Sequence, residues 1–394
     1  MSDKQQQLVE LAGRLADEFA GRAAQHDRAN SFPFENIEAL KHSGYSALVV
    51  PERHGGMGAD LLDFILCQER LAQGCGPTAL AINMHLFGIG SMVERAGPQP
   101  RPEQGLFLEL VGRQRKIIGG GLSEPESGGD WGLFATTARR DGEAYVINGR
   151  KVFTSLSPVV DYFMVMATVE GDGPPSSATF AIARNTPGLE LVETWDAMGM
   201  RATASHDLIL KDVRVAAAAM ADPRPVGPLG AEAISLFAWF ELSIAAVYTG
   251  VAIAAMKFTR EFAQRFKPFT LERPINYLPG VQFAMAQAQV LAAQSRALYT
   301  QTAREHLEGR GADNPEQALA GLIAAKYAAV NNAIRIVDYC MEITGAHGFL
   351  RRNPLERLFR DVRAGINHPL SNARAREFIG KVALGVPLSA VPRW

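Results

Sequence analysis

The middle of this chain, from residue 116 to residue 223, lacks the helical periodicity that both flanks carry. It consists of short β-prone runs separated by turn residues, among them the hairpin dipeptides Asp141-Gly142 and Asn148-Gly149. Several short strands with no helix between them are typical of an antiparallel barrel or sandwich. We expect strands at residues 135–138, 144–147, 151–155, 163–169, 179–183 and 208–215.

Both flanks predict helices. Near the N-terminus, apolar residues recur at helical spacing, which gives a helix one apolar face: Leu8, Leu11, Leu15 and Phe19. In the last third of the chain, Asn314 followed by proline is a typical helix start. The apolar run that follows closes at Gly345, a residue that commonly ends helices.

Prolines and glycines gather at residues 223–230 and predict a hinge. The chain therefore divides into an N-terminal α-helical domain (1–117), a middle antiparallel β-domain (118–222) and a C-terminal α-helical bundle domain (231–394). Helices, then strands, then helices make an α+β fold.

Composition excludes several classes of function. Net charge is −1 and charged residues make up 21%, so we expect no nucleic-acid partner and no membrane association. The N-terminus lacks an apolar signal core, which predicts a cytoplasmic protein. Cys67, Cys75 and Cys340 lack metal-binding spacing, so neither zinc nor a disulfide is expected. No Rossmann or Walker A glycine motif occurs at a strand-to-helix turn.

Four motifs follow one another along the chain. Residues 122–130 (LSEPESGGD) are similar to a Thr-Glu-Pro-x-Ala-Gly-Ser-Asp loop, and residues 148–155 (NGRKVFTS) to Asn-Gly-x-Lys-x-Trp-Ile-Thr. Residues 198–205 (MGMRATAS) form the third, and residues 342–349 (EITGAHGF), continuing to Arg360-Asp361, form the fourth. In this order, on an α-β-α plan, they resemble the acyl-CoA dehydrogenase family.

The resemblance implies an acyl-CoA dehydrogenase-like fold that binds FAD where the β-domain meets the helices. A strand hydroxyl can donate to flavin N5 or accept from its N–H form, which we assign to Ser155. Phe153 offers an aromatic face beside the ring. Leu122 and Ser123 match the motif near the flavin's pyrimidine edge.

The same resemblance places the rest of FAD between subunits. Small residues at Gly128-Gly129 let backbone N–H groups approach a pyrophosphate. Arg265 is the nearest match to an arginine that contacts the FAD of a neighbouring subunit, and Gly345 and Ala346 match a loop with that role. Ser371 falls on a threonine that contacts FAD in the family. The resemblance therefore implies a homotetramer.

The expected catalytic base is missing. Acyl-CoA dehydrogenation needs a base for the α-proton while hydride leaves the β-carbon. Most of the family places a glutamate after the Arg360-Asp361 pair, and that position here is Pro369. A minority places it on the first C-terminal helix, where this chain has Phe240 followed by Glu241. One residue turns a helix by about 100°, so the sequence leaves the direction of Glu241 open.

The replacement segment resembles the reduced-flavin monooxygenases of this fold, such as dibenzothiophene monooxygenase. Arg360 and Arg363 are followed by His368, which matches a histidine near the flavin in those enzymes. Histidine suits proton transfer because its pKa lies near neutrality. His368 could equally cap local backbone groups.

Three functions therefore stay open. The first is an FAD-dependent dehydrogenase of an acyl-CoA-like thioester, using Glu241 or another base and an electron-transfer partner. The second is a monooxygenase that takes FAD, or FMN supplied as reduced flavin by a reductase, with His368 and Ser155 near the flavin. The third is a non-catalytic flavin-binding protein.

Overall fold

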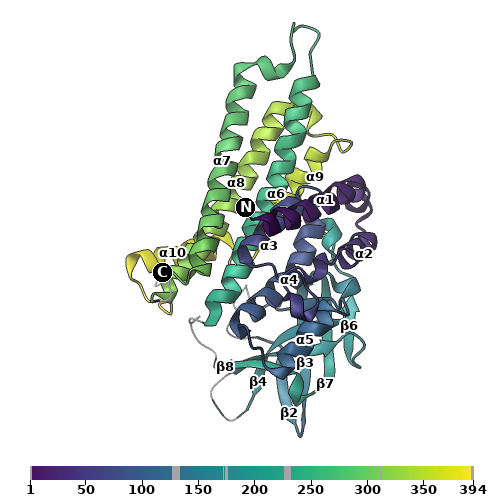
Figure 1. Ribbon diagram of the computed structural model, residues 1–394, viewed down its shortest axis with the longest axis vertical. Coiled ribbons are helices and arrows are strands. Elements are labelled where there is room, and N and C mark those ends of the chain that lie inside the picture. The colour runs from purple at the N-terminus through teal and green to yellow at the C-terminus, as the bar shows by residue number, and fades with distance from the viewer. Residues whose placement is uncertain are drawn as a thin grey trace.

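The computed structural model describes residues 2–126, 134–171, 173, 176–225, 232–310 and 313–391. Figure 1 shows a sheet at one end of the molecule, a group of shorter helices beside it, and long helices that run along the longest axis. The predicted α+β class, with helices before and after the strands, is confirmed.

The N-terminal helices begin with a capping box. Ser2 Oγ accepts from the Gln5 N–H at 3.2 Å, and the Gln5 side chain accepts from the Ser2 N–H at 3.1 Å. Leu8, Leu15 and Phe19 are buried and Leu11 packs partly buried against the core, which confirms the predicted apolar face. The helices are α1 (Asp3–Ala29), α2 (Phe34–His42), α3 (Leu61–Ala72), α4 (Gly76–Ala96) and α5 (Pro102–Gly112).

The sheet has the strand order β6-β7-β3-β2-β4-β5-β8, with β1 paired to β4. Its strands are β1 (Ile118–Gly121), β2 (Thr137–Asp141), β3 (Ala144–Thr154), β4 (Tyr162–Glu170), β5 (Ser176–Ala183), β6 (Leu189–Val192), β7 (His206–Ala216) and β8 (Met220–Pro225). The prediction of an antiparallel sheet was wrong for two pairs, because β4 runs parallel to both β1 and β2. The chain reverses at the β2–β3 hairpin and again before β4, so β4 returns beside β2 in the same direction.

The two turn dipeptides behave differently. Asp141-Gly142 forms the predicted β2–β3 hairpin. Asn148-Gly149 does not form a turn, since β3 runs through it with a register shift against β7. A Cβ on Gly149 would lie 2.3 Å from Thr136 Oγ1, so glycine is required there for close approach to another segment. Asn148 contacts Asp212 across the irregularity.

The prediction of a hinge at residues 223–230 was wrong for residues 223–225, which belong to a strand. Met220–Pro225 forms β8, an end strand of the sheet, which pairs antiparallel with β5. Prolines are tolerated on such a strand because one of its edges needs no donors. Residues 226–230 lie outside the described residues.

The C-terminal helices are α6 (Glu232–Arg265), α7 (Pro279–Leu307), α8 (Pro315–Thr344), α9 (Pro354–Asp361) and α10 (Asn372–Leu384). Asn314 caps α8 by accepting from the Gln317 N–H at 3.1 Å, as predicted. Among the described residues, α6 is the one helix long and apolar enough to span a membrane. Because 89% of its apolar window is buried inside the protein, α6 has the burial of a core helix.

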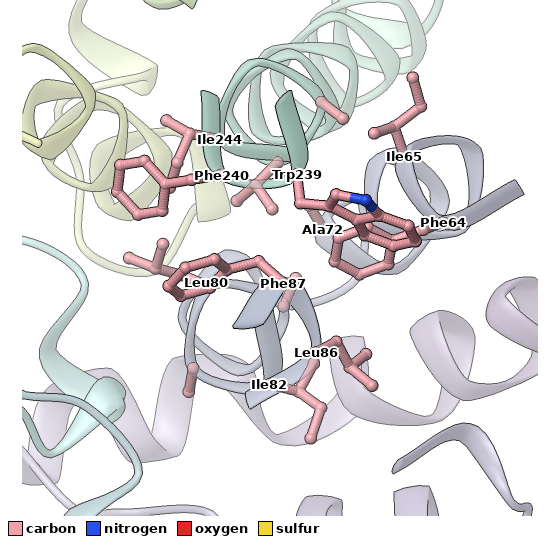
Figure 2. Close-up of a cluster of buried hydrophobic side chains, with 14 of the residues drawn as sticks. Phe64, Ile65, Ala72, Leu80, Ile82, Leu86, Phe87, Trp239, Phe240 and Ile244 are labelled. Atoms are coloured by element: carbon pink, nitrogen blue, oxygen red, sulfur yellow. The ribbon is translucent and has the colours of Figure 1, made fainter. Parts of the chain in front are cut away.

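Helix α6 joins the N-terminal and C-terminal helices into one core (Figure 2). Trp239 stacks on Phe64 of α3, with ring centroids 5.5 Å apart. Phe240 meets Phe87 of α4 edge-on at 5.1 Å. Each fully buried aromatic side chain contributes roughly 1.5–3 kcal/mol, so this contact fixes α6 against the first third of the chain.

Candidate functional site

The end of β3 carries a strained, exposed aromatic residue. Phe153 has a φ of 58° and its register against β7 shifts between Lys151 and Thr154. Its side chain is 64% exposed and touches Trp195 only at the edge, with ring centroids 6.1 Å apart. Such backbone costs about 1–3 kcal/mol per residue and gathers at functional sites. An open aromatic face held in this way fits a flat ring ligand.

A chain of hydroxyl groups begins beside Phe153. Ser155 Oγ lies 2.7 Å from Ser205 Oγ, which lies 2.7 Å from Thr203 Oγ1. Thr203 donates in turn to the carbonyl of Met200 at 3.0 Å. A hydroxyl has one proton, and Thr203 gives its own to Met200, so Ser205 donates to Thr203 and Ser155 donates to Ser205. The oxygen of Ser155 is left with a lone pair, which fits a ligand nitrogen that carries a proton.

A buried ion pair supports this part of the β-domain. Lys151 Nζ lies 2.7 Å from Glu124 Oε1, and both side chains are almost fully buried. Glu124 also accepts from the N–H groups of Ala135 and Thr136. The carbonyl of Ser123 accepts from the Val152 N–H at 2.9 Å, so the segment at residues 122–126 lies against β3. Leu122, the first residue of this segment, packs against the hydrophobic core.

The predicted pyrophosphate residues Gly128 and Gly129 lie outside the described residues.

The loop after β6 connects this region to α9. The Met200 N–H donates to Asp361 Oδ1 at 2.6 Å. A Cβ on Gly199 would lie 2.4 Å from the carbonyl oxygen of Arg360, so glycine permits this approach. Burial raises the pKa of Asp361 to about 6, against the lowering effect of Arg357 and the Met200 N–H.

His368 lies between the end of α9 and the start of α10. Its Nε2 is 2.8 Å from the hydroxyl of Tyr248, a fully buried residue of α6. The His368 ring is half-buried, and desolvation, followed by the charge of Lys326, lowers its pKa to about 3. His368 is therefore neutral at pH 7.

Glu241 is enclosed in the helical core. Its side chain has no exposed surface, and Oε1 accepts from the Leu370 N–H at 3.3 Å. Burial raises its pKa to about 8, while Lys326 and the Leu370 N–H oppose the shift. Glu241 thus lies next to the His368 segment, at a point closed to solvent. Its neighbour Phe240 faces α4.

The residues expected to contact a neighbouring subunit form a separate group. Arg265 ends α6, is largely exposed, and approaches only Glu261 of its own helix among the described residues. The loop that holds Gly345 and Ala346 lies at the same end, because His347 packs on Phe262 and Phe266 at 5.2 and 4.7 Å.

This group is distant from His368. Arg265 follows Tyr248 by 17 residues, which is about 25 Å along a helix. Ser371 instead lies beside His368, just before α10.

Three groups of candidate residues therefore result: Ser123, Phe153 and Ser155 on the β-domain; His368, Ser371 and Glu241 among the helices; and Arg265, Gly345 and Ala346 at the far end of α6. Within the described residues no group of three His, Cys, Asp or Glu side chains could hold a metal ion.

Sequence reasoning missed the partners of these residues. Tyr248 and Lys326 were not singled out, although Tyr248 follows Glu241 by seven residues, which is two helical turns and therefore the same face. Thr203 and Ser205 were part of a quoted motif without a role of their own. A search for polar residues at helical spacing around Glu241 would have found Tyr248.

Comparison with known proteins decides the family. Residues 2–102, 119–213 and 231–366 match the family models for the N-terminal, middle and C-terminal domains of acyl-CoA dehydrogenase. A putative acyl-CoA dehydrogenase of Bacillus subtilis, YdbM, is 37% identical over 93% of this chain and 94% of its own length. This chain belongs to the acyl-CoA dehydrogenase family.

Its other relatives in the family carry diverse names. A 3-(aryl)acrylate reductase of Clostridium sporogenes is 28% identical over 90% of this chain and 92% of its own. The amino sugar nitrososynthase DnmZ of Streptomyces peucetius is 26% identical over 96% and 93%. The family assignment therefore establishes a flavoprotein oxidoreductase scaffold and leaves the reaction open.

Solved structures agree on the scaffold. KijD3, solved with FMN and a dTDP-linked amino sugar, superposes with a TM-score of 0.88 at 25% identity, covering 99% of this chain and 96% of its own. Butyryl-CoA dehydrogenase of Megasphaera elsdenii gives 0.86 at 23% identity, covering 98% and 99%, and shows the shared fold.

Proposed function

We propose that this member of the family is a flavin-dependent monooxygenase, which uses reduced flavin and O₂ to insert one oxygen atom into a small organic substrate. The observation that carries the proposal is the contact between Tyr248 and His368. A buried hydroxyl must place its own proton, and His368 Nε2 is the partner of Tyr248 among the described residues. Nε2 therefore accepts, and the His368 ring carries its proton on Nδ1.

In this tautomer the Nδ1–H of His368 would be free to donate to the flavin site. A neutral imidazole N–H can stabilise negative charge that develops on an oxygen atom. The lowered pKa of His368, about 3, keeps the ring in this form at neutral pH. When bound, reduced flavin supplies two electrons to O₂; one oxygen atom enters the substrate, the other leaves as water, and the flavin is left oxidised.

A second candidate is α,β-dehydrogenation of an acyl-CoA-like thioester with hydride transfer to flavin N5 and an electron-transfer partner as acceptor. Its support is the pKa of Glu241, raised to about 8, since catalytic bases are tuned in this way. Against it, Glu241 has no exposed surface and its Oε1 accepts from Leu370. Proton abstraction would require Glu241 to leave this position.

The flavin ring would be held by the β-domain. Ser155 would lie beside N5, Phe153 would cover the ring edge, and Leu122 and Ser123 would lie near the pyrimidine. We propose FAD, because the exposed Arg265 at the far end of α6 would meet the ADP half of a neighbouring copy's cofactor. Reduced FMN is the alternative, given the FMN in the KijD3 complex.

A second copy of the chain would then complete the site. Gly345 and Ala346 lie with Arg265 at the end of α6, too far from His368 to share its flavin within one chain. Phe283, Val290 and Leu298 leave apolar side chains exposed along one face of α7. Such a row of apolar groups is typical of a subunit interface. We propose a homotetramer, located in the cytoplasm and supplied with reduced flavin by a separate reductase.

The test compares the two half-reactions. The oxidised flavoprotein is mixed anaerobically with a panel of acyl-CoA thioesters, and the chemically reduced protein is mixed with O₂. We expect no bleaching of the flavin band with any thioester, and slow reoxidation through more than one absorbance phase. Bleaching by a thioester, abolished in Glu241→Gln, would establish the dehydrogenase instead.

A further inference from the structure

Two lysines with fully buried side chains, Lys151 and Lys326, stand out among the described residues, and they differ in what they bind. Lys151 forms a close ion pair with Glu124. Lys326, on α8, donates instead to two backbone carbonyls, His368 O at 2.9 Å and Leu370 O at 2.7 Å. The Lys326 ammonium group therefore binds residues 368–370, which belong to no helix or strand.

Glu241 of α6 binds the same segment. Its Oε1 accepts from the Leu370 N–H at 3.3 Å, and Oε2 has no hydrogen-bond partner in the described part of the chain. Lys326 is the charged group that acts on Glu241. Three hydrogen bonds from two buried side chains thus hold His368 and Leu370 by their peptide groups.

Helix α6 contributes a further contact from the same face. Tyr248 lies seven residues after Glu241, two turns along the helix, and holds the His368 ring. The His368 ring is therefore fixed by α6, and the His368 carbonyl by α8. The segment continues directly to Ser371 and α10.

This arrangement is a costly way to hold a helix pair together. Burying a carboxylate and an ammonium costs several kcal/mol each, and apolar residues of similar volume are often at least as stable. Burial raises the pKa of Glu241 and lowers that of Lys326, which reports the same cost. The pair supplies what apolar residues cannot, which is hydrogen bonds to the peptide groups of residues 368 and 370.

We infer that Glu241 and Lys326 are positioning residues: together they hold the His368–Leu370 segment so that His368 faces the flavin site in one orientation. The structural part of this inference stands on the contacts alone. Its catalytic consequence rests on the proposed function, in which His368 acts as a donor. Glu241 then acts through the backbone of the segment and touches neither substrate nor flavin.

The experiment uses the double variant Glu241→Leu with Lys326→Met, which removes both buried ionisable side chains together and leaves neither without the other. We expect it to fold and to melt near the wild-type temperature, while hydrogen exchange of the peptide spanning residues 368–370 becomes at least tenfold faster. Arg296→Met, which breaks the buried contact of Glu69 between α3 and α7, is the matched control. It should lower stability and leave exchange at residues 368–370 unchanged.

The single variant Glu241→Gln adds a rescue. Glutamine keeps an oxygen acceptor for the Leu370 N–H, so exchange and activity should stay within about threefold of wild type, whereas a catalytic base would be lost. Wild-type protection at residues 368–370 in the double variant would overturn the positioning role.

Activity separates this result from a failure of the proposed function. The double variant should lose oxygenation to the same extent as His368→Ala, and adding His368→Ala to it should cause no further loss. If exchange accelerates and His368→Ala is fully active, the positioning role holds and the function assigned to His368 falls. If His368→Ala is inactive and the double variant is active, the positioning role is wrong.

Discussion

The backbone N–H of Met200 donates to the carboxylate of Asp361 at 2.6 Å, joining the β-domain to the last helices. Met200 has a φ of 53°, and its carbonyl receives the hydroxyl chain that ends at Ser155. Asp361 is fully buried, and its charge acts on Tyr248, the partner of His368. The group of candidate residues on the β-domain and the group around His368 are therefore both in reach of one buried carboxylate.

Ser155→Ala should slow flavin reactivity about fivefold, since the lost hydrogen bond is worth roughly 1 kcal/mol. The thermal midpoint should change little, because Ser155 is only partly buried. Stopped-flow reoxidation of the reduced protein measures the first effect and calorimetry the second. Ser205→Ala should act in the same direction by removing the partner of Ser155; unchanged kinetics in both variants would remove Ser155 from the site.

Tyr248→Phe removes the hydroxyl that fixes the tautomer of His368 and should lower oxygenation by roughly a hundredfold, the lower end of the range for loss of proton control. More of the O₂ consumed should leave as H₂O₂, which a peroxide assay quantifies. Tyr45→Phe is the control, because Tyr45 is equally buried and donates to Gln68 at 2.9 Å. It should lower stability without changing the peroxide yield; an equal yield change would assign both effects to packing.

Arg265→Ala should weaken FAD binding about tenfold, the loss of one charged hydrogen bond, and leave FMN binding unchanged. Arg260→Ala changes a second exposed arginine on a different face of α6 and should alter neither affinity. Fluorescence titration with both flavins measures the difference. Equal loss for FAD and FMN would mean that Arg265 does not reach an ADP group.

Phe283→Asp should dissociate the assembly, because it places a charge in the proposed apolar interface of α7. Light scattering coupled to size exclusion reports the mass, and FAD affinity should fall with it. Leu106→Asp changes an exposed leucine on α5 and should leave the mass and the FAD affinity unchanged. An unaltered mass for Phe283→Asp would exclude this face of α7.

His85 should make stability depend on pH. It is buried, accepts from the Ile118 N–H at 3.0 Å, and lies 2.9 Å from the Ser46 carbonyl. Burial lowers its pKa from 6.5 to about 4. The folded protein then binds fewer protons than the unfolded chain in this window, so the contribution is present above pH 6.5 and is lost as pH falls towards 4.

His85→Gln removes this titration. The raised pKa values of Glu241 and Asp361 act in the opposite direction, so the measured quantity is the difference between wild type and variant. That difference in unfolding free energy should shrink by about 3 kcal/mol from pH 6.5 to pH 4. A difference that stays constant with pH in denaturant titrations would show that His85 is not held neutral.

Local chemistry was enough to predict several elements. Asn314 accepts from an N–H only three residues away. Leu8, Leu15 and Phe19 lie within one helix. Both features depend on neighbours in the chain, so the sequence was enough to predict them. Asn148-Gly149 has the local signal of a turn, yet the glycine there serves the approach of Thr136. A dipeptide cannot report a neighbour from another segment, and the turn prediction failed for that reason.

The candidate site likewise has a part that the sequence predicted and a part that only the tertiary structure shows. The sequence by itself identified the family motifs, because they are contiguous runs of side chains, and it predicted site roles for Phe153, Ser155 and His368. Only the tertiary structure decided what holds them: Tyr248 lies 120 residues from His368 in the chain, and Lys326 lies 42 residues away. Hydrogen bonds and burial depend on distance in space, so packing of α6 against α8 was needed to enclose Glu241 and to set the tautomer of His368.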